Sequence, residues 1–190
     1  MIITYQGTES FKISQGDLSI AVNPMSARGS ADVTLISSSV FAGDGKGFVI
    51  QGPGEYEVKD IGIKGFLSES TYNAEPRINT IYMISFEGMN LCFLGPLSNP
   101  ALKPETLENL EDIDMLFVPL ADGTLDAAAA YKLAVSLEPS VIIPMHYTAD
   151  TLKKFIKEAG EEKVDAIDKL VVKKKDLDGK EGEIIVLKEE

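Results

Sequence analysis

Apolar and polar residues alternate in short runs through the first half of the chain, a pattern typical of strands with one buried face. Glycine, proline and aspartate separate the runs, as in Gln15-Gly16-Asp17 and Gly52-Pro53-Gly54, and these residues favour tight turns. Helical spacing is scarce before residue 100. The runs that we predict as strands are Ile2–Gln6, Ser10–Ser14, Leu18–Val22, Val33–Ile36, Phe48–Gln51, Glu55–Val58, Ile61–Phe66, Thr80–Phe86 and Asn90–Leu94.

The second half of the chain alternates between helical and strand patterns. Pro104 opens a predicted short helix over Lys103–Leu110, because a proline without an N–H loses no hydrogen bond in the first turn. Thr124 is the predicted N-cap of a helix over Ala127–Leu137. The remaining predictions are an amphipathic helix that Asp150 or Thr151 caps and Gly160 ends, and strands at Met115–Pro119, Val141–Pro144, Leu170–Lys174 and Ile184–Lys188.

Together these elements predict one α/β domain over residues 1–190, with two mixed sheets packed face to face between helical layers. We expect Val33–Ile36 and Val141–Pro144 to be central strands, because their apolar, β-branched residues suit burial on both faces. Their carboxyl ends should lie on one shared face. With 190 residues and 44% hydrophobic content, such a chain can bury about 70% of the surface that it exposes when unfolded.

The charge of the chain limits its partners. A formal net charge of −12 repels phosphate backbones and anionic lipids, so we predict neither a nucleic-acid nor a membrane partner. The basic run Lys173–Lys175 is followed by Asp176 and Asp178, and we interpret it as a solvated strand end. No apolar run approaches the roughly 20 residues that span a bilayer, and Met1–Tyr5 begins in strand-like residues without a secretory leader. We therefore expect a cytoplasmic protein.

Residues that bind soft metals are nearly absent. The chain holds one histidine, His146, and one cysteine, Cys92, whereas a histidine-built zinc site needs three or more nitrogen or sulfur ligands. Cys92 lies in an apolar run and is predicted to be a small core residue. A hard cation such as Mg²⁺ could still bind carboxylates, although acids in loops are expected of a chain with 30 acidic residues. The acids considered for such a site are Asp44, Glu55, Glu57 and Asp122.

Several segments keep the order and spacing of a known family. They are Ile3-Thr-Tyr-Gln-Gly7 with Ser10-Phe11, Ile20-Ala-Val-Asn-Pro24, Ala31–Ile36, Gly52–Glu57, Leu94-Gly95, and Thr124–Ala128 running into Val141–Tyr147. The chain thereby resembles the metallo-β-lactamase fold family, in the branch of small predicted zinc-dependent hydrolases and sugar-lactone hydrolases. The resemblance implies a four-layer αββα sandwich and, in the family, zinc-dependent hydrolysis.

The first ligand loop of the family is altered in this chain. After the strand matching Val33–Ile36, the family has Thr-His-x-His-x-Asp-His, whereas this chain has Ser37-Ser-Ser-Val-Phe-Ala-Gly43. The positions that would carry metal ligands hold Ser38, Val40, Ala42 and Gly43. Three of these four residues have no side-chain donor.

Other ligand positions have also changed. Pro96 follows Gly95 where the resemblance implies a bridging aspartate, and Leu67–Ser70 lacks the middle histidine. Asn23 replaces the acid of the family's Asp-Pro pair, so that only the terminal histidine, His146, remains. The resemblance therefore implies a degenerate member for which we expect no bound zinc and no other cofactor.

The candidate pocket is expected at the carboxyl ends of the strands. His146 could bind an anion or act as a general base there, but we favour a vestigial residue whose ring is held by backbone or serine hydroxyl groups, since no complete mechanism surrounds it. We interpret the serine run as local caps of a strand end rather than nucleophiles, because no orienting acid and no Gly-x-Ser-x-Gly turn accompany it. The candidate pocket residues are His146, Ser37, Ser38, Ser39, Asn23 and Asp44.

Three hypotheses for function follow. We favour a non-catalytic member of the fold that acts as a binding or structural protein with an unknown ligand. The alternative is a hydrolase, either with a rebuilt site of serine and His146 or of a carboxylate-bound metal, or with residual metal-dependent activity. A subunit that works only within a homo-oligomer or hetero-oligomer is compatible with the first hypothesis.

Overall fold

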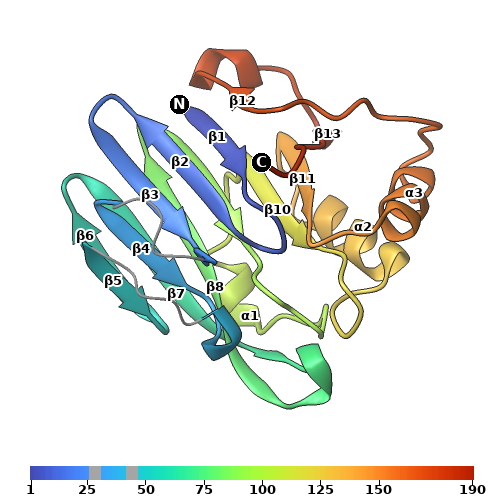
Figure 1. Cartoon of the computed structure of the whole chain (residues 1–190), viewed down its shortest axis with the longest axis horizontal. Helices are drawn as coiled ribbons and strands as arrows, with labels where there is room; N and C mark the ends of the chain where they lie inside the picture. The colour runs from blue at the N-terminus through green and yellow to red at the C-terminus, as the bar shows by residue number, and fades with distance from the viewer. Residues whose placement is uncertain (26–30, 42–46) are drawn as a thin grey trace.

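The computed structural model describes residues 1–25, 31–41 and 47–190, and it places their strands in two mixed sheets (Figure 1). In the first sheet β1, β2 and β3 are antiparallel, and β3, β4 and β5 are parallel. The strand order is β12 (Leu170–Val171), β1 (Ile2–Tyr5), β2 (Phe11–Gln15), β3 (Leu18–Val22), β4 (Val33–Ile36) and β5 (Phe48–Gln51).

The second sheet is antiparallel on one side and parallel on the other. Strands β6 to β9 form antiparallel pairs, and β9, β10, β11 and β13 run parallel. The strand order is β13 (Glu183–Ile184), β11 (Val141–Met145), β10 (Met115–Pro119), β9 (Met89–Phe93), β8 (Arg77–Phe86), β7 (Ile61–Ser70) and β6 (Gly54–Val58).

One core lies between the two sheets and a second lies under the helices. Phe11 from the first sheet meets Phe93 and Phe117 from the second, and the last two rings stack with centroids 3.8 Å apart. The other face of the second sheet packs against α2 (Ala127–Ser136) and α3 (Ala149–Glu158), while α1 (Pro104–Leu107) precedes β10. Figure 1 shows α2 and α3 together on one side of the molecule. This arrangement confirms the predicted α/β sandwich.

Both strands that we expected at the centre have a hydrogen-bonded neighbour on each side, and all their residues are buried. Each is nevertheless the last strand but one in its sheet, because β5 and the short β13 add only one strand beyond them. The buried Cys92 lies in the core under the helices, and burial raises the pKa of its thiol. That placement confirms its prediction as a core residue.

Several predicted boundaries were wrong. The strand predicted over Leu170–Lys174 stops at Val171, and a 3₁₀ turn, η3 (Lys174–Leu177), follows because Leu177 turns into the core. The predicted strand over Ile184–Lys188 is reduced to β13 and isolated bridges that involve Leu187 and Glu189. The helix predicted over Lys103–Leu110 covers only Pro104–Leu107.

The predicted helix caps were also displaced. Asp126 rather than Thr124 caps α2, with its side chain accepting the N–H of Ala129. Thr148 caps α3 in a reciprocal arrangement with Thr151. Hydrogen bonds connect the N-terminal strand to the C-terminal part of the chain. The amino group of Met1 donates to the Val172 carbonyl, and the Glu190 N–H donates to the Tyr5 carbonyl.

Candidate functional site

His146 directly follows β11 in a backbone conformation that few residues adopt. Its φ angle is 54°, in the left-handed region that disfavours side chains with a Cβ. Its backbone N–H donates to the Tyr5 hydroxyl at 2.9 Å, and that hydroxyl donates to the carbonyl of Thr8 at 2.8 Å. The strained backbone of His146 is therefore held by Tyr5 at the end of β1, whose hydroxyl is in turn bonded to the loop that follows.

The imidazole of His146 contacts two polar side chains that the sequence analysis did not identify. Its Nδ1 lies 3.3 Å from Oε1 of Glu9, and its Nε2 lies 3.2 Å from the hydroxyl of Tyr72 in the turn η2 (Tyr72–Ala74). The rings of Tyr72 and His146 meet edge-on at 4.9 Å, and Phe41 stacks on Tyr72 at 6.4 Å. Our expectation that backbone or serine groups hold the imidazole was therefore wrong.

Glu9 is the buried acid of this cluster. It is 0% exposed, and its Oε2 has no hydrogen-bond partner among the described residues. Burial raises the pKa of its carboxyl group, and the hydrogen bond from His146 partly offsets that rise. Burial and the negative charge of Glu9 also raise the pKa of Tyr72. Tyr72 therefore keeps its proton at neutral pH, so we assign its O–H as the donor to Nε2 and the Nδ1–H as the donor to Glu9.

Asn23 and Ser37 form a second polar pair near the end of β4. The Asn23 amide donates to the Ser37 hydroxyl at 2.9 Å, and the Ser37 N–H donates back to the Asn23 side-chain oxygen at 2.8 Å. The Ser37 carbonyl accepts the N–H of Thr80 at 2.8 Å and so connects β4 to β8. The side chain of Ser37 thus bonds to a residue 14 positions earlier in the chain, whereas the sequence analysis predicted local caps of the strand end. Ser38 differs, because its buried hydroxyl has no partner among the described residues.

The loop after β9 leaves no space beside this pair. Gly95 has a φ of 61°, and a Cβ built there would lie 2.3 Å from the Asn79 side-chain oxygen and 3.0 Å from the Ser37 side chain. The amide of the fully buried Asn79 donates to the Leu94 carbonyl and to the Ser68 hydroxyl, both at 2.8 Å. Amide and hydroxyl groups thus pack closely against Gly95, the residue before Pro96, where the family resemblance implied a bridging acid.

The structure separates the predicted pocket into two parts. Ser37, Ser38 and Ser39 line a cavity of about 560 Å³ together with residues of the β5–β6 turn and of β8. His146 instead belongs to the cluster with Glu9 and Tyr72, and none of its hydrogen bonds in the described part of the chain is to a serine. Asn23 is bonded to Ser37 beside the cavity. Asp44 lies outside the described residues.

In the part of the chain that the structure describes, the donor groups do not fit the zinc that the fold family implies. Within residues 1–25, 31–41 and 47–190, no three His, Cys, Asp or Glu side chains are grouped so that they could hold a metal ion. Glu55 and Glu57 lie exposed on the edge strand β6. Both ring nitrogens of His146 already have hydrogen-bond partners. In the same described ranges, no helix has the length and apolar character needed to cross a bilayer.

Comparisons with known proteins agree with this fold. Residues 2–146 match the family described as the β-lactamase superfamily domain. A solved structure from Thermotoga maritima, a candidate Zn-dependent hydrolase of the metallo-β-lactamase superfamily, is 27% identical with a TM-score of 0.77 and covers 98% of this chain and 97% of its own. No curated protein matches the chain.

Two more distant structures share the fold. A candidate metal-dependent hydrolase from Parabacteroides distasonis is 17% identical with a TM-score of 0.67, covering 98% of this chain and 93% of its own. A metallo hydrolase from Ignicoccus hospitalis is 16% identical with a TM-score of 0.63, covering 90% and 99%. The sandwich is thus of the metallo-β-lactamase type, as the sequence predicted.

Proposed function

Because the chain belongs to the β-lactamase superfamily, we propose that it is a member that uses this fold for binding, without zinc and without hydrolysis. The observation that carries the proposal is that both ring nitrogens of His146 have hydrogen-bond partners. Its Nδ1 faces Glu9 and its Nε2 faces the Tyr72 hydroxyl. A metal-bound histidine commonly donates one ring N–H to a carboxylate and offers the other nitrogen to the metal. In this chain an O–H donor occupies that second nitrogen.

The cost of releasing His146 supports the same proposal. Moving the imidazole toward a metal would leave the buried Glu9 carboxyl group without its hydrogen-bond partner, and leaving a buried acceptor unsatisfied costs about 1–3 kcal/mol. One imidazole cannot offset that cost, because zinc affinity depends on several ligands held together. Hydrolases of this fold rely on a bound metal to supply hydroxide. The described residues offer no group of ligands that could hold such a metal.

The cluster has a structural role in place of a metal site. Glu9 comes from the β1–β2 loop, His146 from the end of β11, and Tyr72 from η2, while Phe41 ends the turn η1 (Ser39–Phe41) that follows β4. Hydrogen bonds and ring contacts therefore join four loops at one end of the sandwich. In our proposal they hold the binding face in a fixed shape.

Elemental analysis and zinc titration test the proposal. Protein purified without chelator and then dialysed should contain far less than one zinc per chain, and calorimetry near neutral pH should show no tight zinc binding. Tyr72→Phe is the informative variant, because it frees Nε2 of His146 without changing the ring. We expect Tyr72→Phe also to bind no zinc tightly, since one imidazole is insufficient.

Two results would contradict the proposal. One is about one zinc per wild-type chain that is lost in His146→Ala. The other is covalent labelling of a residue among Ser37 to Ser39 by a fluorophosphonate probe, with labelling lost in His146→Ala, because this would establish a serine nucleophile activated by a histidine base. The first result would establish a metal site that the proposal denies, and the second would make the protein an enzyme rather than a binding protein.

A further inference from the structure

The cavity lined by the serine run contains two buried polar groups without partners. The Ser38 hydroxyl and the Nε of Arg77 both belong to its lining, and neither has a hydrogen-bond partner among the described residues. Ser38 is only 4% exposed. A buried polar group without a partner is unfavourable, and few occur in a folded protein. Two such donors on one cavity indicate a ligand that accepts hydrogen bonds.

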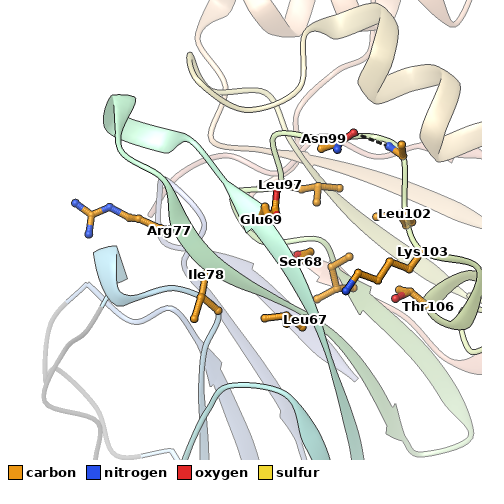
Figure 2. A pocket seen from close by; sticks show the side chains of 12 residues that line it. Leu67, Ser68, Glu69, Arg77, Ile78, Leu97, Asn99, Leu102, Lys103 and Thr106 are labelled. Atoms are coloured by element: carbon orange, nitrogen blue, oxygen red, sulfur yellow. Dashed lines mark hydrogen bonds between the residues drawn. The ribbon is translucent and has the colours of Figure 1, made fainter.

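The charge of the cavity indicates the sign of that ligand. Arg77 is the one charged side chain of the described lining, in a chain whose formal net charge is −12. Its Nη2 already binds a carboxylate, that of the exposed Glu75, while its buried Nε has no partner among the described residues. Figure 2 shows the Arg77 side chain pointing away from Lys103 and Thr106, two residues of a neighbouring pocket of about 270 Å³ whose lining also includes Arg77 and Ile78. Arg77 is therefore the one cation of the described lining, and part of its guanidinium is shared with Glu75.

The other walls of the cavity are largely apolar. Ile78 on β8 is 66% exposed. Pro53 lies in the β5–β6 turn, and Pro76 directly precedes β8. Ile36 at the end of β4 completes this surface. An exposed isoleucine beside an arginine and a buried hydroxyl suits a ligand with an apolar body and one anionic end.

We propose that this cavity binds a small monocarboxylate whose carboxylate accepts hydrogen bonds from Arg77 and Ser38 and whose apolar part lies against Ile78. A planar guanidinium pairs well with a carboxylate. A phosphate dianion would leave a charge uncompensated here, since the described lining holds only one cation. The inference rests on the proposed function, because it names the class of ligand that the zinc-free protein binds.

Hexanoate is a suitable probe, with hexanol as the uncharged match and inorganic phosphate as the other anion. Binding is measured by chemical-shift perturbation of the wild-type protein after treatment with EDTA. We expect hexanoate to shift signals of the serine run and of the start of β8, and neither hexanol nor phosphate to do so. Arg77→Gln should weaken hexanoate binding by about tenfold or more, and Ser38→Ala by about fivefold.

Matched variants separate the site from general effects of charge and folding. Lys103→Gln removes one positive charge from the neighbouring pocket and should leave hexanoate affinity within about twofold. Arg77→Lys keeps the charge but loses the planar pair of donors, so its affinity should lie between those of wild type and Arg77→Gln. Urea unfolding of each variant establishes that it is folded.

Three results would overturn the inference. They are equal binding of hexanol and hexanoate, tighter binding of phosphate than of hexanoate, or equal weakening by Lys103→Gln and Arg77→Gln. Absence of hexanoate binding to zinc-free wild-type protein would also overturn it while leaving the proposed function intact. Zinc retained after dialysis would instead contradict the proposed function, whatever the result with hexanoate.

Discussion

Glu9 connects the chemistry of the site to the stability of the protein. Its carboxyl group is fully buried, and one of its oxygens has no partner in the described part of the chain. Burial raises its pKa above the value of 4.5 for an unperturbed glutamate. The folded protein therefore holds the Glu9 proton to a higher pH than the unfolded chain does, and between those two pKa values stability falls as the pH rises.

Glu9→Gln removes this titration. From about pH 4.5 upward, the free energy of unfolding of wild type should therefore fall relative to that of the variant, until the pH exceeds the pKa of Glu9 in the folded protein. Urea unfolding of both proteins at several pH values between about 4.5 and 8 measures the difference. A constant difference over that range would mean that Glu9 titrates alike in the folded and unfolded states.

His146→Ala removes the partner of Glu9. We expect the free energy of unfolding to fall by about 3 kcal/mol near neutral pH, because the buried carboxyl group of Glu9 is left without its hydrogen-bond partner. Tyr72→Phe should cost only about 1 kcal/mol, as it removes one hydrogen bond and keeps the ring contacts. Equal losses in the two variants would show that the contact between Glu9 and His146 is not the dominant one.

The sequence identified His146 and the serine run but neither Glu9 nor Tyr72. Glu9 is 137 residues from His146, and Tyr72 is 74 residues from it. An acid after a Gly-Thr turn resembles an exposed loop residue, and nothing local indicates that it is buried. Arg77 was missed for the same reason, since only the packing of β8 beside the end of β4 brings it to Ser38.

At the scale of elements, the sequence predicted strands better than helix ends. Leu18–Val22, Val33–Ile36 and Phe48–Gln51 were predicted with the bounds that β3, β4 and β5 have, because their apolar content marks them directly. Strands β7 and β8 extend beyond their predictions through polar residues. Ser68 and Asn79 are register partners there, and their side chains bond to each other, so polar residues continue the ladder.

The cap of α2 shows that the path of the chain can override a capping signal in the local sequence. Thr124 was the predicted cap, but its hydroxyl donates to the Ala121 carbonyl at 2.6 Å in the preceding turn. Asp126 caps the helix instead, accepting the Ala129 N–H at 2.8 Å. Both residue types are good N-caps, and only the path of the chain decides between them.

Asp126→Ala should therefore lower the free energy of unfolding by about 1 kcal/mol, the usual cost of losing an N-cap. Asp122→Ala is the matched control, because it removes an exposed aspartate of the preceding loop that does not cap α2, and it should change stability by less than about 0.5 kcal/mol. The measurement is urea unfolding followed by circular dichroism. A similar loss in both variants would indicate a general effect of charge.

At the scale of the whole molecule, the two ends of the chain close the first sheet and the core between the sheets. Figure 1 shows the N- and C-termini near each other. Leu187 is fully buried in that core although it lies near the C-terminus, and a bridge between Tyr5 and Glu189 joins β1 to the last residues. The C-terminal segment is thus part of the fold's main core.

Leu187→Ala should cost about 3 kcal/mol, because it opens a space among packed core residues. Val171→Ala changes a side chain that is 62% exposed and should cost less than about 0.5 kcal/mol. Thermal and urea unfolding of the two variants measure the contrast. If Leu187→Ala behaved like Val171→Ala, the C-terminal segment would not be packed in solution as it is in this structure.

The single thiol of the chain allows its opening motions to be followed by the rate of cysteine modification. Cys92 is enclosed beneath the helices, and its raised pKa disfavours the thiolate that reacts with disulfide reagents. Modification therefore requires the second sheet and its helices to separate. When closing is faster than reaction, the modification rate is proportional to the population of open molecules. The kinetics of one natural cysteine thus report how often the helices separate from the second sheet under native conditions, without denaturant or an introduced label.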